Sequence, residues 1–227
     1  MRPGILLRLG FVFLLMATLA ASATVLPAPP VETVPLDAGL ETTVVAGGCF
    51  WGVQAVFAHV KGVTRAVAGY TGGSTRSPTY DTVSNGDTGH AEAVHLTFDP
   101  RTISYGQLLQ IYFAVAHDPT ERHGQGPDFG TQYRSALFTT NPAQQRLAEA
   151  YIAQLSAAHV FNAPIVTTVA PLTVFYAAED YHQDYAFRHP SVPYIMWFDL
   201  PKIRHLKQQF AAWYRDTPAL VRPGKIP

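Results

Sequence analysis

The chain has 227 residues, 48% of them apolar, and its 16 basic and 16 acidic residues give a formal charge of zero. This balance is typical of a single globular domain with a substantial core, and it excludes a disordered or fibrous chain. The neutral charge and the absence of a basic run exclude the electrostatic footprint of a nucleic-acid-binding protein.

The N-terminus has the pattern of a secretory leader. Arg2 and Arg8 give a basic start, and an uncharged apolar run from Leu9 to Ala20 leads to small residues. This pattern predicts a signal peptide over residues 1–23 and an exported protein, periplasmic or secreted. The alternative is an uncleaved anchor, although the run is short for a bilayer span. Prolines then predict an extended linker or arm over residues 24–41.

The folded domain is expected to span residues 42–227, and it opens with a strand and a helix. The β-branched run Thr42–Ala46 predicts the strand, and Gly47 and Gly48 end it. Apolar residues recur at helical spacing from Cys49 onward. The cysteine therefore lies at the first turn of a helix, where free backbone N–H groups and the helix dipole are expected to lower the pKa of the thiol.

Cys49 is the only cysteine of the chain, so no internal disulfide framework exists. A lone cysteine can be a small buried hydrophobe. The helix-terminal position of this one, between two glycines and an aromatic pair, favours a reactive thiol instead.

Glu92 stands out in the next part of the chain. A strand is predicted over Gly62–Tyr70, a long functional loop over residues 71–90, and a strand from Ala91 to Pro100. Glu92 alternates in phase with the apolar residues of this last strand, so it faces the covered side of the sheet. Burial would raise the pKa of its carboxyl group toward that of a general acid. The alternative is an exposed glutamate at a frayed strand start.

The second half of the chain alternates between helices and strands. Ser104 is the expected N-cap of one helix, and Asn141 and Pro142 cap and open another. The predicted elements are a helix over 103–117, a strand over 132–140, a helix over 142–158, a strand over 163–171, and helices over 177–189 and 202–216. Without a strict βαβ repeat, this order predicts an α+β single domain, a two-layer sandwich of a mixed sheet with packed helices around a ferredoxin-like core.

Several motifs together resemble peptide methionine sulfoxide reductase of type A. They are GCFWG, GYTGG, TGHAEAVHLTFDP, HDPT, GPDFGTQYRSALF and AEDYHQDY, and they run in that family's order from about Val44 to Pro190. The resemblance implies reduction of the (S)-S-oxide of methionine, in proteins and in free form. It also implies a cysteine sulfenic acid intermediate.

The resemblance assigns roles to the residues that match the family's motifs. Cys49 matches the nucleophile that attacks the sulfoxide sulfur, and Glu92 matches the acid that protonates the sulfoxide oxygen. Tyr80 and Tyr133 match the hydroxyls that hydrogen-bond this oxygen. Neutral carboxyl and phenol groups can donate such bonds, whereas their anions cannot.

The substrate pocket is implied in the same way. Phe50 and Trp51 match its apolar walls, and Asp128 matches its acidic residue. Two positions near the pocket differ from the residue that many family members have. Gln54 stands in place of a glutamate, and this difference is interpreted as a surface or helix-end change. Pro127 stands in place of an asparagine and could reshape the loop before Asp128.

The resolving cysteines that many family members carry near the C-terminus are absent. The sulfenic acid on Cys49 must then be reduced by an external thiol, such as a thioredoxin-like protein. No metal or cofactor is expected, and the protein is expected to be a monomer.

Three other interpretations compete. His117 and His182 could suggest a metal site, but their spacing resembles no zinc motif. HDPT and AEDYHQDY are expected to serve as a helix-end turn and as packing. A thiol hydrolase would need a histidine close to Cys49, and a non-catalytic peptide-binding module would leave Glu92 without a purpose.

Overall fold

The computed structural model describes residues 26–32, 35 and 38–221. It is an α+β domain built on one six-stranded sheet with the strand order β7-β6-β1-β3-β2-β8. The β6–β7 pair is parallel and the other pairs are antiparallel, so the sheet is mixed. The predicted α+β class is confirmed.

The first half of the domain follows the prediction closely. Its elements are β1 (Glu41–Ala46), α1 (Phe50–Ala58), β2 (Val63–Thr71), α2 (Tyr80–Ser84) and β3 (Ala91–Phe98). The helix α2 was not predicted, because the turn residues around it dominate the loop. Thr79 caps it through a reciprocal hydrogen-bond pair with Thr82, and such a cap stabilises a helix of only five residues.

The second half contains α3 (Tyr105–Ile111), β4 (Gly124–Gln125), β5 (Asp128–Phe129), β6 (Ala136–Thr139), α4 (Pro142–Ala157), β7 (Thr168–Pro171), β8 (Phe175–Ala177), α5 (Tyr185–Arg188) and α6 (Leu200–Gln209). The predicted caps are confirmed: the Ser104 side chain accepts from Gln107 N–H, and the Asn141 side chain accepts from Gln144 N–H. The edge strand β8 was not predicted.

Two predicted helices are wrong in extent. The region 177–189 breaks into a 3₁₀ turn and the short α5, because Gln183 is extended and Asp184 is left-handed with φ 58°. Long-range hydrogen bonds of the Gln183 side chain to β2 hold this break. The last helix begins earlier, after a π-helical turn over Ile195–Asp199, and ends at Gln209.

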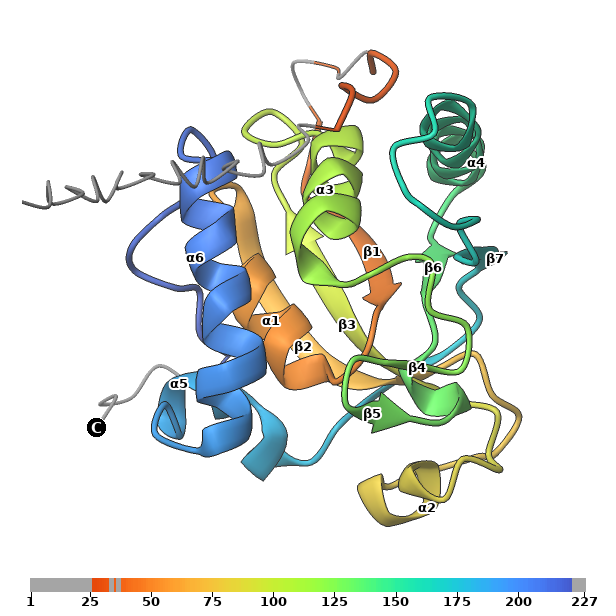
Figure 1. Cartoon of the computed structure of the whole chain (residues 1–227), viewed down its shortest axis with the longest axis vertical. Helices are drawn as coiled ribbons and strands as arrows, with labels where there is room; N and C mark the ends of the chain where they lie inside the picture. Colours follow the sequence, from red (N-terminus) through yellow and green to blue (C-terminus); the bar gives the residue numbers. More distant parts are fainter. Residues whose placement is uncertain (1–25, 33–34, 36–37, 222–227) are drawn as a thin grey trace, which may run out of the picture.

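One face of the sheet carries the main core. Figure 1 shows α1 and α3 lying across this face, with α6 outside α1. Buried side chains of β1, β2 and β3 pack there against α1, α3 and α4. Val94, Leu96 and Phe98 of β3 belong to this core, whereas Ala91 and Ala93 belong to a smaller cluster on the opposite face. The predicted alternation of β3 is confirmed.

The described part of the N-terminal arm lies on α3 and α4. Gln110 and Tyr151 donate hydrogen bonds to the carbonyls of Leu26 and Pro27, and the Glu32 carboxylate accepts from Gly106 N–H. The predicted signal peptide over residues 1–23 lies outside the described residues. Within the described ranges, none of the helices combines the length and the apolar character needed to cross a bilayer.

Candidate active site

A cavity of about 190 Å³ lies where β1 runs into α1. Figure 1 shows the start of α1, the β4–β5 hairpin and α2 at this same end of the molecule. The residues that line the cavity are Cys49, Phe50, Trp51, Tyr80, Glu92, Asp128, Tyr133 and Tyr194. The structure therefore brings together every site residue that the sequence predicted, from five separate segments of the chain.

Cys49 is the N-cap residue of α1 and is 9% exposed. The glycine before it has φ +87°, a left-handed backbone that favours glycine, and its N–H donates to the carbonyl of Tyr133 at 3.1 Å. This turn ends β1 and places the thiol at the start of α1. Its hydrogen bond holds Tyr133 beside the thiol.

The expectation of a lowered thiol pKa is wrong. Burial raises the pKa of Cys49 well above its usual range, and the nearby carboxyl groups of Glu92, Asp199 and Asp128 raise it further. The Trp51 N–H at the start of α1 opposes this shift but does not overcome it. The thiol is therefore protonated at neutral pH, because burial and the nearby carboxyl groups raise its pKa more than the start of α1 lowers it.

Glu92 is 2% exposed, and its Oε2 accepts a hydrogen bond from Phe50 N–H at 3.0 Å. Burial raises the pKa of its carboxyl group to about 8, against the lowering effect of that hydrogen bond. The predicted burial and raised pKa are confirmed, and the alternative of an exposed, frayed glutamate is wrong. Glu92 thus carries a proton at neutral pH in a cavity shared with a thiol.

Two phenol groups complete the polar side of the cavity. Tyr80 is the first residue of α2, and its N–H is held by the Glu179 carboxylate at 2.8 Å. Tyr133 ends a 3₁₀ turn after β5. Burial first, and the Glu92 carboxyl group next, raise the pKa of both phenols, so both remain protonated donors.

Aromatic packing fixes the apolar side. The Trp51 ring stacks on Tyr185 with centroids 3.9 Å apart, and its Nε1 donates to His182 Nδ1 at 3.0 Å. The His182 ring also contacts Phe50 and Tyr80. The AEDYHQDY segment therefore serves as packing and hydrogen bonding behind the cavity, as predicted.

A family model described as peptide methionine sulfoxide reductase matches residues 41–214. The chain belongs to this family. Peptide methionine sulfoxide reductase MsrA 2 of Mesorhizobium japonicum is 56% identical to it over 183 residues, which cover 81% of this chain and 94% of that protein.

Solved structures agree with this assignment. Mxr1 from Saccharomyces cerevisiae in reduced form has a TM-score of 0.64 and 32% identity, covering 69% of this chain and 89% of that one. Methionine sulfoxide reductase A of Corynebacterium diphtheriae has a TM-score of 0.59 and 35% identity, covering 71% and 81%. The activity of the chain is accordingly that of a peptide methionine sulfoxide reductase, MsrA.

The competing interpretations find no support in the geometry of this reductase. Among the described residues, no histidine lines the cavity of Cys49, and no group of three or more potential ligands could hold a metal. His117 is buried in the scaffold, where its Nε2 lies 2.7 Å from Ser135 Oγ. It ends the π-helical turn after α3, as the helix-end interpretation of HDPT predicts.

The interpretation of Gln54 as a surface change is wrong. Its side chain is 1% exposed. Its amide donates to the carbonyl of Ala66 and to Gln183 Oε1 at 2.9 and 3.0 Å, and it accepts from Asp184 N–H at 2.9 Å. Gln54 therefore joins α1 to β2 and to the segment before α5, behind the wall formed by Trp51.

Sequence reasoning missed Tyr194, which lines the cavity and donates a short hydrogen bond to Asp128 Oδ2. Burial raises the pKa of Asp128, and this bond together with the Lys202 charge opposes the shift. Tyr194 stands 66 positions from Asp128, in a stretch of mixed aromatic residues without a recognisable motif, so only the tertiary fold relates them.

The buried acid of this reductase predicts a pH-dependent stability difference. The pKa of Glu92 is raised from 4.5 to about 8, so the folded state keeps a proton that the unfolded chain loses, and stability falls as pH rises through this window. Glu92→Gln cannot ionise, and we expect it to gain about 2–4 kcal/mol in unfolding free energy over wild type at the alkaline end of the window. Urea unfolding at several pH values measures this. A difference that is constant with pH would contradict the protonated state of Glu92.

Proposed function

We propose that Cys49 attacks the sulfur of a methionine sulfoxide while Glu92 protonates its oxygen. The observation that carries this proposal is the shared cavity, in which a thiol and a carboxyl group with a pKa of about 8 face the same space. A sulfoxide is a poor electrophile until its oxygen gains a proton, and a neutral carboxyl group can supply it. The Tyr80 and Tyr133 hydroxyls donate hydrogen bonds to the same oxygen.

The proton inventory follows from the protonated state of both groups. As Glu92 gives its proton to the sulfoxide oxygen, the thiol of Cys49 gives its own proton to the Glu92 carboxylate. The attack forms a bond between Cys49 Sγ and the substrate sulfur. Transfer of the protonated oxygen to Cys49 Sγ then breaks both the substrate S–O bond and this S–S bond, which leaves methionine and a cysteine sulfenic acid with no net change in protons. The raised pKa of the thiol is compatible with this exchange, because no free thiolate has to exist before substrate binds.

The substrate is the S epimer of methionine sulfoxide, in proteins and in free form, since each epimer has its own enzyme. Phe50 and Trp51 hold the S-methyl group against apolar walls. Asp128, oriented by Tyr194, accepts hydrogen bonds from the substrate. All of these groups come from one chain, which supports function as a monomer. The cellular role of the protein is the repair of oxidised proteins under oxidative stress.

The sulfenic acid is reduced by an external thiol, such as a thioredoxin-like protein, because the sequence offers no second cysteine. The described C-terminal segment, residues 210–221, contributes no residue to the lining of the cavity. Backbone hydrogen bonds of Trp213, Arg215 and Ala219 hold it at the end of α1 that is remote from Cys49.

The domain and its location complete the proposal. Residues 1–23 act as a signal peptide, residues 24–41 as an arm, and the catalytic domain is exported to the periplasm or secreted. Four adjacent strands have the order β6-β1-β3-β2. Along the chain, α1 lies between β1 and β2, and α3 lies between β3 and β6. These strands form a ferredoxin-like core, with the helices in a second layer.

One turnover without reductant tests the proposed chemistry. We expect each enzyme to reduce one equivalent of a methionine sulfoxide peptide and to become one oxygen heavier on Cys49. Dimedone should trap this species, and a small thiol should convert it to a mixed disulfide and then to the free thiol. Mass spectrometry of the intact protein and of its peptides gives the readout. Reduction of two equivalents before reductant is added would require a second redox centre and would refute the scheme.

A further inference from the structure

A second, smaller cavity of about 70 Å³ also reaches Cys49. It shares Cys49, Asp128 and Tyr194 with the first cavity, but Glu92, Tyr80 and Tyr133 do not line it. Its remaining lining residues are Gln125, Gly126, Pro127, Phe198 and Lys202. Two cavities with different chemistry therefore approach Cys49: Glu92, Tyr80 and Tyr133 line the first and Lys202 lines the second, while the Asp128 carboxyl group lines both.

Lys202 has an unusual setting at this second cavity. Its side chain is 20% exposed, and its Nζ lies 3.7 Å from Asp199 Oδ1, which is too long for a hydrogen bond. Within the described ranges no other ion pair of Lys202 occurs. Lys202 is the one basic residue among those that line this cavity.

Asp199 holds this lysine in place. Its carboxylate is fully buried, and neither of its oxygens has a hydrogen-bond partner in the described part of the chain. It lies against the first turn of α1, where a Cβ on Gly52 would collide with the carboxylate and come within 3.1 Å of Lys202 Nζ. A buried carboxylate without hydrogen bonds is costly unless a cation is near it, and Lys202 is the cation that lies beside Asp199.

The proposed reaction gives this cation a use. After sulfoxide reduction, the oxygen on Cys49 comes from a substrate held in the cavity of Glu92 and the tyrosines. A thiolate that displaces this oxygen attacks the sulfur from the side opposite to the breaking S–O bond. Cys49 lines the second cavity whereas Glu92 does not, and a lysine at the wall of this cavity favours a thiolate over a thiol.

We propose that the second cavity is the access route of the reductant, and that Lys202 positions its thiolate and selects reductants with negative charge near the thiol. This inference rests on the proposed sulfenic acid on Cys49. The reductant sulfur forms an S–S bond with Cys49 as the S–O bond breaks, and the oxygen leaves with a proton as water. A second thiolate then attacks the mixed disulfide, which frees Cys49 and oxidises the reductant to its disulfide.

The test compares thiols of different charge on the oxidised enzyme. Enzyme oxidised by one turnover is mixed with mercaptoethanesulfonate, mercaptoethanol or cysteamine, and the loss of the sulfenic acid is followed by rapid quench and mass spectrometry. We expect Lys202→Met to slow the anionic thiol most and the cationic thiol least, with about a tenfold difference between these two effects. Lys202→Arg should restore most of the preference.

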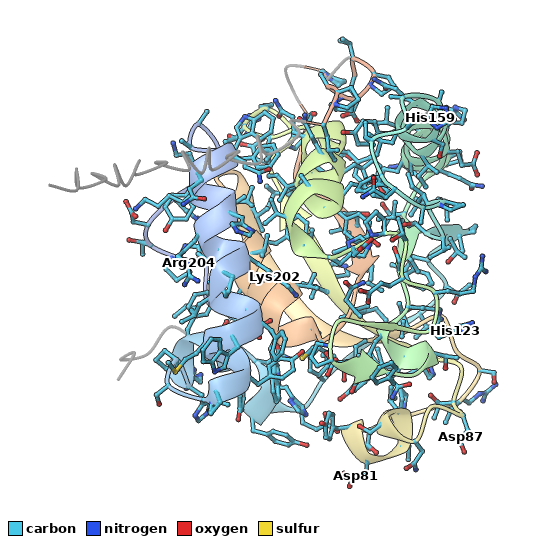
Figure 2. All side chains as sticks on the ribbon, viewed as in Figure 1. Asp81, Asp87, His123, His159, Lys202 and Arg204 are labelled. Carbon is cyan, nitrogen blue, oxygen red and sulfur yellow. The ribbon has the colours of Figure 1, made fainter. Side chains whose placement is uncertain are left out.

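Two further variants make the result specific. Arg204 lies on the outer, exposed side of α6, away from Lys202 (Figure 2), so Arg204→Met removes one charge from the same helix and should leave the preference unchanged. The double variant Asp199→Asn, Lys202→Met removes the buried carboxylate together with its counterion. It should show the same loss of preference even if Lys202→Met alone folds poorly.

The outcomes separate the inference from the proposed function. If wild-type enzyme gains no oxygen on Cys49, the proposed function fails, and the inference fails with it. If the sulfenic acid forms but Lys202→Met slows the three thiols by one common factor, or if Arg204→Met has the same effect, the inference alone is refuted.

Discussion

Cys49→Ser is expected to abolish methionine sulfoxide reduction in single and multiple turnover. Cys49 is the only thiol of the chain, and the serine hydroxyl can neither attack the sulfoxide sulfur with comparable strength nor form a sulfenic acid. The side chains of serine and cysteine are similar in size, and Cys49 is a cap residue at which serine is favoured, so the fold should persist. The measurement is methionine formation by the purified variant in the presence of thiol.

Binding provides the control for this variant. Phe50, Trp51 and Asp128 are unchanged in Cys49→Ser, so the protein should still bind a methionine sulfoxide peptide in calorimetry. Appreciable turnover by a preparation free of wild-type enzyme would exclude Cys49 as the nucleophile.

Glu92→Gln is expected to slow the chemical step by roughly 10²–10⁴-fold, the usual contribution of a positioned general acid. Glutamine keeps an oxygen that can accept from Phe50 N–H, so the start of α1 should be preserved, but its amide cannot protonate the sulfoxide oxygen. Single-turnover rates in rapid quench isolate this step from the recycling by thiol.

The pH profile distinguishes proton donation from a structural effect. In wild type, the chemical rate should depend on a group with a pKa of about 8, and this dependence should be lost in Glu92→Gln. Tyr80→Phe and Tyr133→Phe are matched variants that each remove one hydroxyl and retain Glu92. A glutamine variant within a few-fold of wild type would show that a tyrosine or water donates the proton.

The strongest local patterns were the most reliable guides to this fold. The period of β3 placed Glu92 on the core face, and the change from β-branched to helical spacing placed Cys49 at the start of α1. The caps Ser104 and Asn141 marked the starts of α3 and α4 correctly. Each of these features depends on neighbours within a few positions, so the local sequence is sufficient to predict it.

Long-range contacts are the reason why two predictions from the sequence, the helix over 177–189 and the surface position of Gln54, are wrong. The helix expected over 177–189 breaks at Asp184 because Gln183 binds β2, more than a hundred positions away. Gln54 is buried for the same reason, since its partners lie in β2 and in the segment before α5. Neither partner can be recognised from a helical or alternating pattern.

The sequence by itself determined where the candidate groups lie: one thiol at a helix start, one acid on a buried strand face, and the motifs that relate the chain to a reductase. Only the tertiary structure decided their protonation, because the pKa of Cys49 depends on burial and on Glu92, Asp199 and Asp128, which other segments of the chain bring close. It also decided that Tyr194 and Lys202 stand beside the thiol. Local periodicity dictates which face a residue occupies, whereas the electric field at a buried site is the sum over groups that are distant in sequence.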